Sequence, residues 1–175
     1  MTSRETPVDS IDDGDMTWLN DASLCVVVIG ASGDLAKKKT YPSLLNLYVD
    51  NLLPKNMRIF GFARSDLTDQ DLRDRLRPFL LKSKHSEEKI DSFLQQCFYH
   101  GGESYGDVDG FGALNTSMET FEKENANDVQ QQNRLFYFAI PPNVFGETAV
   151  AIKKTSMQAE GTYCILLPLV AGRDV

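Results

Sequence analysis

The sequence predicts an α/β domain built on a doubly wound, mostly parallel sheet with flanking helices. Short apolar runs rich in β-branched residues alternate with longer amphipathic stretches, as expected of βα units around a parallel sheet. The first apolar run leads directly into a glycine-containing loop and a basic, helix-like segment. The 175 residues suffice for one domain with a sizeable core and are too few for two ordinary domains.

The first half of the chain contains two predicted strands and a helix between them. Residues 24–29 are almost all apolar, as in a strand that is buried on both faces. A helix is predicted over residues 34–49, and Pro42 should kink or interrupt it because proline lacks a backbone donor. Residues 58–63 form the second predicted strand.

Helix caps mark the elements that follow. Thr68 and Ser86 are predicted N-caps, because acidic residues follow each of them in the first turn, where the helix dipole favours negative charge. The apolar stripe of the second of these helices is predicted to extend to Cys97. Residues 101–112 are predicted to form a glycine-rich loop before a helix around Met118.

The last part of the chain contains a strong predicted strand over residues 135–140, bounded by Pro141 and Pro142. Residues 144–157 are predicted to be helical, and residues 163–167 form the last apolar run.

Composition and charge exclude several classes of partner. The net charge of −7 argues against nucleic acid, whose phosphates need a basic surface. No apolar run approaches the roughly 20 residues that span a bilayer, so no membrane insertion is expected. Three widely separated cysteines predict neither a disulfide framework nor a metal site, and they indicate a reducing compartment. Cys25 and Cys164 lie in apolar runs and are predicted to be small core residues.

Residues 1–22 are predicted to be a disordered acidic tail, and residues 23–175 the folded domain. The tail has no apolar core of a secretory signal and is too acidic for a transit peptide, so we expect a cytoplasmic protein.

The sequence GASGDLA, placed between a strand and a helix, predicts a dinucleotide-binding loop. Gly30 can take the positive φ of a tight turn, and the missing side chain at Gly33 would let a pyrophosphate approach the backbone. The following helix N-terminus would supply unpaired N–H groups to the phosphates. Gly30, Gly33 and Ala36 give the spacing GxxGxxA, which departs from the full fingerprint, so a structural turn is the alternative.

Arg64, at the end of the second predicted strand, favours NADP over NAD. An NAD site usually carries an acidic residue there for the ribose hydroxyls, whereas a guanidinium can pair with a 2′-phosphate in a bidentate manner. The alternative is a surface arginine without a ligand.

Three segments, in this order and at these distances, resemble the N-terminal coenzyme domain of the glucose-6-phosphate dehydrogenase family: GASGDLAKKKTYPSLLNLYVDNLLP, GFARS and NRLFYFAIPPNVF. The similarity begins at about Leu24 and covers only the N-terminal part of a family member. It implies a Rossmann-like fold and NADP-dependent oxidation of glucose 6-phosphate to 6-phosphogluconolactone, the first step of the pentose phosphate pathway.

The resemblance also implies cofactor-binding residues by position. Arg64 matches the ligand of the 2′-phosphate, Phe145 stands where the family has a coenzyme-contacting aromatic that is often Tyr, and Pro141 and Pro142 match a loop beneath the coenzyme. The matched coenzyme loop consists of Gly30, Ala31, Ser32, Gly33, Asp34, Leu35, Ala36 and Lys37.

Two catalytic features of the family have no counterpart in this sequence. The family continues into Glu-Lys-Pro-Phe-Gly-Arg-Asp, whereas residues 168–171 here place Leu169 at the position of the lysine that reaches substrate and coenzyme. The signature Asp-His-Tyr-Leu-Gly-Lys, whose histidine takes the proton of the sugar C1 hydroxyl, does not occur. His85 and His100 lie in polar contexts and are predicted to be solvated loop residues.

We therefore assign no catalytic residue and no metal ligand, and expect the chain to be the coenzyme-binding part, inactive alone. Homo-oligomers are expected only with the family's C-terminal domain. A non-catalytic dinucleotide-binding module is one alternative function. A short-chain dehydrogenase or reductase is another, but it needs a Lys four residues after a Tyr, and none of the six tyrosines has one.

Overall fold

The computed structural model describes residues 21–125, 131–157 and 162–167. These residues contain a parallel sheet with the strand order β3-β2-β1-β4-β5. The strands are β1 (Ala22–Ile29), β2 (Asn56–Ala63), β3 (Cys97–Gly101), β4 (Gln131–Phe138) and β5 (Thr162–Leu166). The strand β1 begins at the last residue assigned to the acidic tail, and most of that tail lies outside the described residues.

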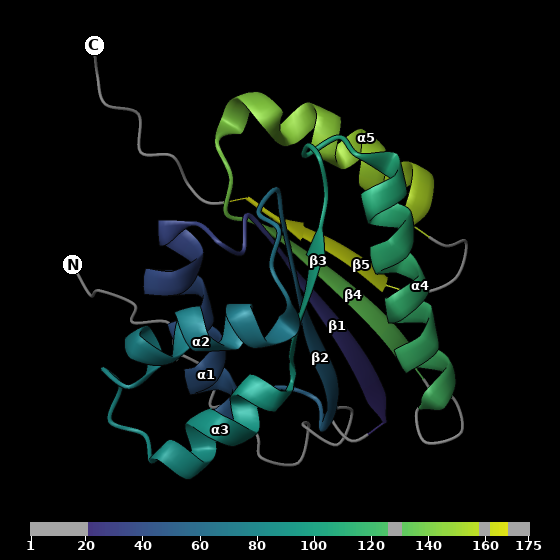
Figure 1. The fold of residues 1–175 in the computed structure, drawn as a ribbon. Helices are drawn as coiled ribbons and strands as arrows, with labels where there is room; N and C mark the ends of the chain where they lie inside the picture. Colours follow the sequence, from purple (N-terminus) through teal and green to yellow (C-terminus); the bar gives the residue numbers. More distant parts are fainter. Residues whose placement is uncertain (1–20, 126–130, 158–161, 168–175) are drawn as a thin grey trace, which may run out of the picture.

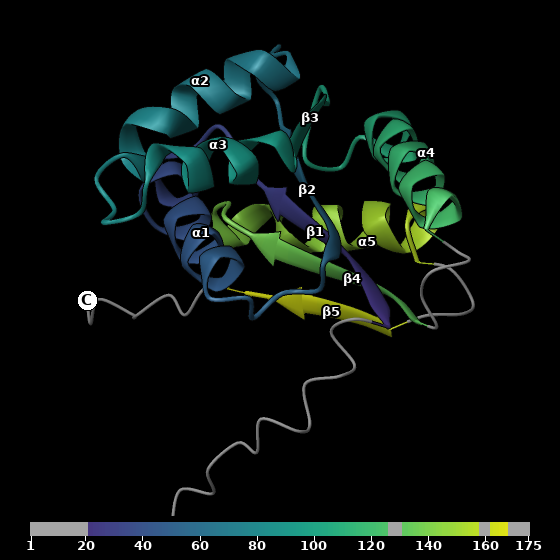
Figure 2. The same cartoon turned by 90° about the horizontal axis from the view of Figure 1, so that it is seen from below.

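Helices cover both faces of the sheet (Figures 1 and 2), which confirms the predicted doubly wound α/β class. One face carries α1 (Tyr41–Val49), α2 (Asp69–Leu80) and α3 (Glu87–Gln95). The other carries α4 (Val108–Glu124) and α5 (Phe145–Thr155). Short helical turns precede two of these helices: η2 (Ala36–Thr40) before α1, and η3 (Pro142–Val144) before α5. No helix within the described ranges is both long and apolar enough to cross a membrane.

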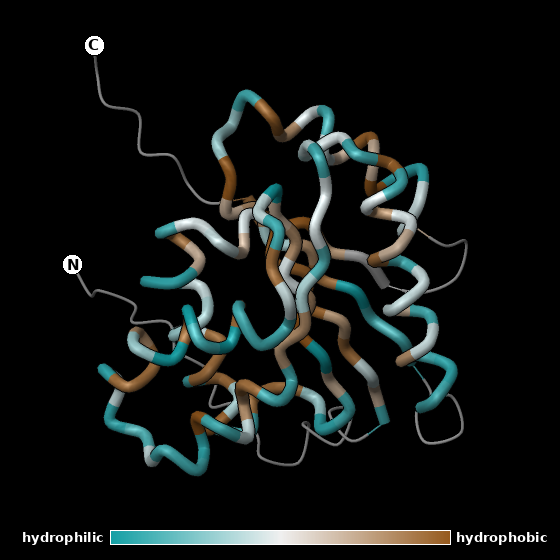
Figure 3. Tube along the Cα trace, in the orientation of Figure 1, coloured by the Kyte–Doolittle hydropathy of each residue, from teal (hydrophilic) through white to brown (hydrophobic). Residues whose placement is uncertain are grey.

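Strand β1 divides the apolar interior into two clusters. Val26 and Val28 pack toward α1, α2 and α3, whereas Cys25, Val27 and Ile29 pack toward α4 and α5. The hydrophobic stretches in Figure 3 accordingly concentrate along the strands, and polar stretches run along the helices. Because both faces of β1 are covered, its sequence is apolar at successive positions rather than at alternate ones.

The helical segment after β1 continues through Pro42 without the predicted interruption, but it changes its winding just before this residue. The N–H of Tyr41 donates to the carbonyl of Ala36, five residues back, so η2 is a π-helical turn. Pro42, at the start of α1, has no N–H to continue the α-helical ladder. Gly61 on β2 lets this helix approach the sheet, since a Cβ there would lie 2.9 Å from the hydroxyl of Tyr41.

The two predicted caps differ in their contacts. The Thr68 hydroxyl accepts from the N–H of Asp71 at 3.1 Å, and the Asp71 carboxylate accepts from the N–H of Thr68 at 2.8 Å. This reciprocal pair is a capping box that starts α2. Ser86 precedes α3 as predicted, but its side chain makes no capping hydrogen bond.

Strand β3 and the start of α4 correct the sequence prediction. Cys97, predicted on the stripe of a helix, is the first residue of β3, and α4 begins at Val108 inside the predicted loop of residues 101–112. Among the described strands β3 pairs only with β2, so its conformation depends on a neighbour that is distant in the chain. The Asp107 carboxylate accepts from the N–H groups of Asp109 and Gly110, and this cap starts α4 despite its glycines.

The cysteine prediction is half correct. Cys25 is buried between β1 and the second helix layer, whereas Cys164 is exposed. Cys164 lies on β5, which pairs only with β4 among the described strands, so this position lacks the cover that a central strand receives.

A buried ion pair joins α4 to β4. Arg134 donates from Nε and Nη2 to the two carboxylate oxygens of Glu122, at 2.6 Å each. Its Nη1 donates to the side-chain oxygen of Asn115 and to the carbonyl of Ser156, at 2.7 Å each. The Cys25 thiol lies 3.9 Å from Glu122 and donates to it. One guanidinium thus connects β4 to α4 and to the end of α5.

We expect Glu122→Ala to lower the free energy of unfolding by about 3–5 kcal/mol, because it leaves the buried Arg134 guanidinium without its counter-charge. Urea denaturation measures this loss. The neighbouring exposed Lys123→Ala is the control and should change the free energy by no more than about 0.5 kcal/mol. Equal effects of the two substitutions would contradict a structural role for the buried pair.

Candidate dinucleotide-binding site

The predicted coenzyme residues lie where the carboxyl ends of the parallel strands meet. The glycine loop follows β1, Arg64 follows β2, and Phe145 begins the helix after β4. From β1 the chain adds β2 and then β3 toward one edge of the sheet. It then crosses back to β4, on the other side of β1, and adds β5 toward the opposite edge. The strand order therefore reverses between β1 and β4. Open α/β sheets bind ligands outside the strand ends at such a point.

The turn after β1 depends on Gly30, whose predicted positive φ is confirmed at 86°. Its N–H donates to the carbonyl of Phe62 at 2.7 Å, and the N–H of Gly33 donates back to the carbonyl of Gly30 at 2.9 Å. A Cβ at Gly30 would lie 2.5 Å from the carbonyl oxygen of Ala139. No residue with a side chain fits this position without displacing the backbone after β4.

Three backbone donors of the loop are available to a ligand. Within the described residues, no acceptor takes a hydrogen bond from the N–H of Ser32, Asp34 or Leu35. These groups lie at the start of the helical segment, where unpaired N–H groups and the helix dipole favour an anion. Gly33 sits among them without a side chain. The loop therefore fits the pyrophosphate of a dinucleotide.

The side chains of the predicted loop divide into two groups. Ala31 and Ala36 are fully buried, so they hold the loop against the core rather than present side chains to a ligand. The Asp34 carboxylate is exposed and receives Lys38 at 2.7 Å and Lys37 at 3.3 Å. Hydrogen bonds from Lys38 and then Lys37 hold the pKa of Asp34 below its usual range. The negative charge of Asp34 is thus offset by the lysines that follow it.

Arg64 is exposed at the end of β2, beside an open pocket of about 410 Å³. Its guanidinium lies 5.0 Å from the ring centroid of Tyr105, within the distance of a cation–π contact. Asp66, Glu103 and Asp107 also line the pocket. Because these carboxylates bring negative charge to the pocket, a phosphate there would depend strongly on Arg64.

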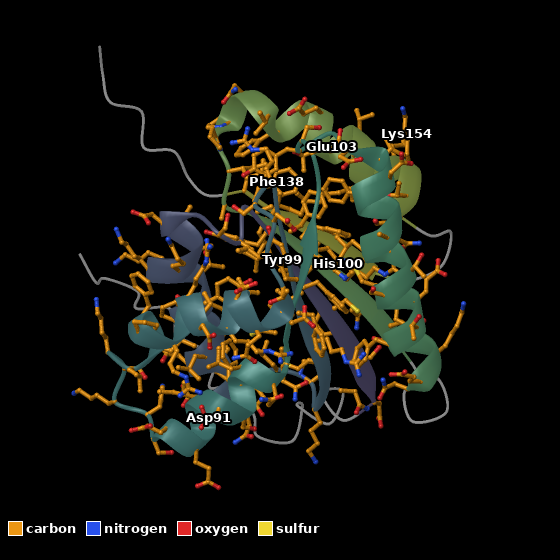
Figure 4. The ribbon with its side chains drawn as sticks, in the orientation of Figure 1. Asp91, Tyr99, His100, Glu103, Phe138 and Lys154 are labelled. Atoms are coloured by element: carbon orange, nitrogen blue, oxygen red, sulfur yellow. The ribbon has the colours of Figure 1, made fainter. Side chains whose placement is uncertain are left out.

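Tyr99 is a site residue that the sequence prediction missed. It lies on β3 beside His100 (Figure 4), and its hydroxyl is 2.6 Å from the carbonyl of Ser65 and 3.2 Å from that of Ala63, to which it donates. Burial raises the pKa of Tyr99 to about 12, so the hydroxyl stays a donor at neutral pH. Tyr99 fixes the backbone on both sides of Arg64. Only the pairing of β3 with β2 reveals this contact.

A serine pair connects the glycine loop to the Arg64 segment. The hydroxyls of Ser32 and Ser65 lie 3.0 Å apart and share a hydrogen bond. The loop after β3 also contributes: Asp107 accepts from the N–H of Glu103 at 2.9 Å, and Gly102 donates to the carbonyl of Ala63 at 3.1 Å. Backbone–backbone and side-chain bonds therefore hold three strand ends in one arrangement.

Phe145 packs into the second apolar cluster. Its ring centroid lies 5.5 Å from that of Phe138 in an edge-to-face arrangement, and the side chain is half-buried. The ring is therefore fixed near the end of β4, and its contact with a coenzyme stays a prediction. Leu169 lies outside the described residues.

The histidine prediction needs one correction. His100 lies on β3 rather than in a loop, is partly buried, and has a pKa lowered mainly by that burial. His85 lies in the turn after α2, partly buried, with Nε2 2.8 Å from the side-chain oxygen of Asn46. Neither lines the pocket beside Arg64. The described residues contain no group of His, Cys, Asp or Glu side chains that could hold a metal ion.

Comparisons with known proteins identify the family to which this chain belongs. The family model described as "Glucose-6-phosphate dehydrogenase, NAD binding domain" matches residues 27–167. A chloroplastic glucose-6-phosphate 1-dehydrogenase of Spinacia oleracea is 39% identical over 158 residues, which are 88% of this chain and 26% of the relative. The Caenorhabditis elegans enzyme is 44% identical over 131 residues, 75% of this chain and 24% of that relative.

A solved structure titled as glucose-6-phosphate dehydrogenase in complex with its substrate glucose-6-phosphate matches the fold with a TM-score of 0.75. It is 35% identical and the match covers 83% of this chain and 30% of that one. The chain spans about a quarter of the length of the curated relatives it matches. These matches do not favour the short-chain dehydrogenase alternative. The chain belongs to the glucose-6-phosphate dehydrogenase family and comprises its NAD-binding domain.

Proposed function

We propose that this chain binds NADP and supplies the coenzyme-binding part of the oxidation of glucose 6-phosphate to 6-phosphogluconolactone, the first step of the pentose phosphate pathway. The proposal rests on the position of two neighbouring segments, the glycine loop and the end of β2. Unpaired N–H donors of the loop after β1 lie beside a strand end that carries Arg64, and a serine hydrogen bond of 3.0 Å connects the two segments. Family membership supports the substrate.

Different residues would bind different parts of NADP. The N–H groups of Ser32, Asp34 and Leu35 would hold the pyrophosphate, and the guanidinium of Arg64 would pair with the 2′-phosphate. Lys37 adds positive charge next to the loop. When bound, NADP supplies a nicotinamide ring that accepts a hydride. Tyr99 keeps the Arg64 segment in place through its hydrogen bond to the carbonyl of Ser65.

The remaining assignments are part of the same proposal. No residue of this chain is assigned to take the proton of the sugar hydroxyl. Residues 1–22 are proposed to be an acidic tail and residues 23–175 the coenzyme domain of a cytoplasmic protein. Homo-oligomers would form through the family's C-terminal domain. A measurable rate of NADPH formation by this chain from glucose 6-phosphate would contradict the absence of a catalytic residue.

Substitution of Arg64 tests the proposed contact with the 2′-phosphate. We expect Arg64→Ala to weaken NADP⁺ binding by roughly tenfold to a hundredfold, because a charge-assisted hydrogen bond contributes about 1.5–3 kcal/mol. Binding of NAD⁺, which lacks the 2′-phosphate, should change by less than about threefold. Calorimetric titration of both cofactors measures the difference. An equal loss for the two would count against pairing between Arg64 and the 2′-phosphate.

Substitution of Tyr99 tests whether its hydroxyl positions the Arg64 segment. Tyr99→Phe removes the hydroxyl that fixes the Ser65 carbonyl, so we expect NADP⁺ affinity to fall severalfold and stability by about 1 kcal/mol. The matched control is Tyr48→Phe, because the Tyr48 hydroxyl also makes a hydrogen bond, to Ser92 at 2.8 Å, but far from the site. Unchanged NADP⁺ affinity in Tyr99→Phe would show that this hydroxyl does not position Arg64.

A further inference from the structure

A cationic cavity lies between α1, the end of α2 and the turn that follows α2. It has a volume of about 590 Å³, and its lining includes Lys38, Asn46, Phe79, Lys82, Lys84 and His85. It shares no lining residue with the pocket beside Arg64. No acidic residue of the described chain lines it, although the protein carries a net charge of −7. Positive charge is therefore concentrated at this cavity, although the net charge of the protein is negative.

Hydrogen bonds hold the turn that carries the lysines. Continuing from the last turn of α2, the N–H of Lys82 donates to the carbonyl of Phe79 at 3.3 Å, and that of Ser83 to the carbonyl of Leu80 at 2.9 Å. His85 then bonds through its ring to Asn46 on α1 at 2.8 Å. The turn is thus tied to both helices, and the wall of the cavity is fixed before any ligand arrives.

The cations differ in their partners. Lys38 pairs with Asp34 at 2.7 Å. Lys82 and Lys84 have no carboxylate within ion-pair distance among the described residues. The Lys82 ammonium lies 5.1 Å from the ring centroid of Phe79, which also lines the cavity. This cation–π contact holds the ammonium group beside the cavity. Two lysines therefore keep their charge available to an anion.

We propose that this cavity binds a small molecule that carries two or more linked phosphate groups. Lysine ammonium groups bind phosphate as point charges, and two of them suit a ligand with more than one charge. The volume falls within the range of small-molecule sites and exceeds what a single phosphate fills. Phe79 and Pro42 provide an apolar floor for the rest of such a ligand. The site goes beyond the proposed coenzyme function, because no residue assigned to the dinucleotide lines it.

The test compares two double variants of the full chain. Lys82→Gln with Lys84→Gln should weaken binding of inorganic pyrophosphate and of ATP by about tenfold or more at low salt. The control is Lys55→Gln with Lys89→Gln, which removes the same charge beside a different cavity and should change affinity by less than about twofold. Affinities are taken from the side-chain signals of Asn46 and His85, because pyrophosphate or ATP can also bind at the N–H groups of the coenzyme loop, and that binding would mask the result in a calorimetric titration.

Nuclear magnetic resonance locates the ligand through the side-chain signals of Asn46 and His85. If both ligands shift these signals, the phosphate chain is recognised; if only ATP does, the nucleoside contributes through the apolar floor. Both results support the site. Equal losses in the two double variants, or no shift with either ligand, would overturn it. NADP⁺ binding by the Lys82 and Lys84 variant should equal that of the parent, which separates this site from the coenzyme proposal. Thermal unfolding of both variants confirms that they fold.

Discussion

The close approach of three strand ends at Gly30 is the constraint on which the candidate site depends. The chain leaves β1 with a positive φ, and the position of an absent Cβ lies 2.5 Å from the Ala139 carbonyl after β4. At the same place the N–H groups of Gly30 and Ala31 both donate to the carbonyl of Phe62 on β2. Because these contacts use the first N–H groups of the loop, the unpaired donors begin at Ser32. The backbone therefore fixes where an anion can bind.

The Arg64 segment, which we propose meets the 2′-phosphate, is held by contacts made one strand further out. Arg64 is exposed, and its own side chain contacts only the ring of Tyr105 among the interactions of the described residues. The backbone around it is held from two sides, by the Tyr99 hydroxyl on β3 and by the Ser32 hydroxyl on the glycine loop. An exposed guanidinium on a fixed backbone suits the proposed pairing with a phosphate, because it supplies the positive charge that the surrounding carboxylates oppose.

The distribution of charge differs between the two proposed anion sites. Carboxylates surround Arg64 in its pocket, whereas no acidic residue of the described chain lines the cavity beside Lys82 and Lys84. The buried pair of Arg134 and Glu122 serves a different purpose. Its charges are enclosed and cannot attract a ligand, but they connect β4 with α4 and α5 on the face that carries Phe145.

Local chemistry let the sequence predict much of the fold. The apolar run that becomes β1, the Thr68 cap and the positive φ of Gly30 all depend on neighbours within a few residues. The glycine loop and Arg64 could be placed at adjacent strand ends for the same reason, since successive strands of a βα unit pair in parallel.

The sequence by itself thus determined the fold class and the central strands, and it predicted the candidate site residues. The tertiary structure alone decided the identity of β3, the role of Tyr99 and the exposure of Cys164. It also decided that Arg134, on a strand, pairs with Glu122 on a helix. These features share a physical cause. An edge strand, a buried ion pair and a hydroxyl that bonds a distant carbonyl are stabilised by partners far apart in the chain, and no local pattern records such partners.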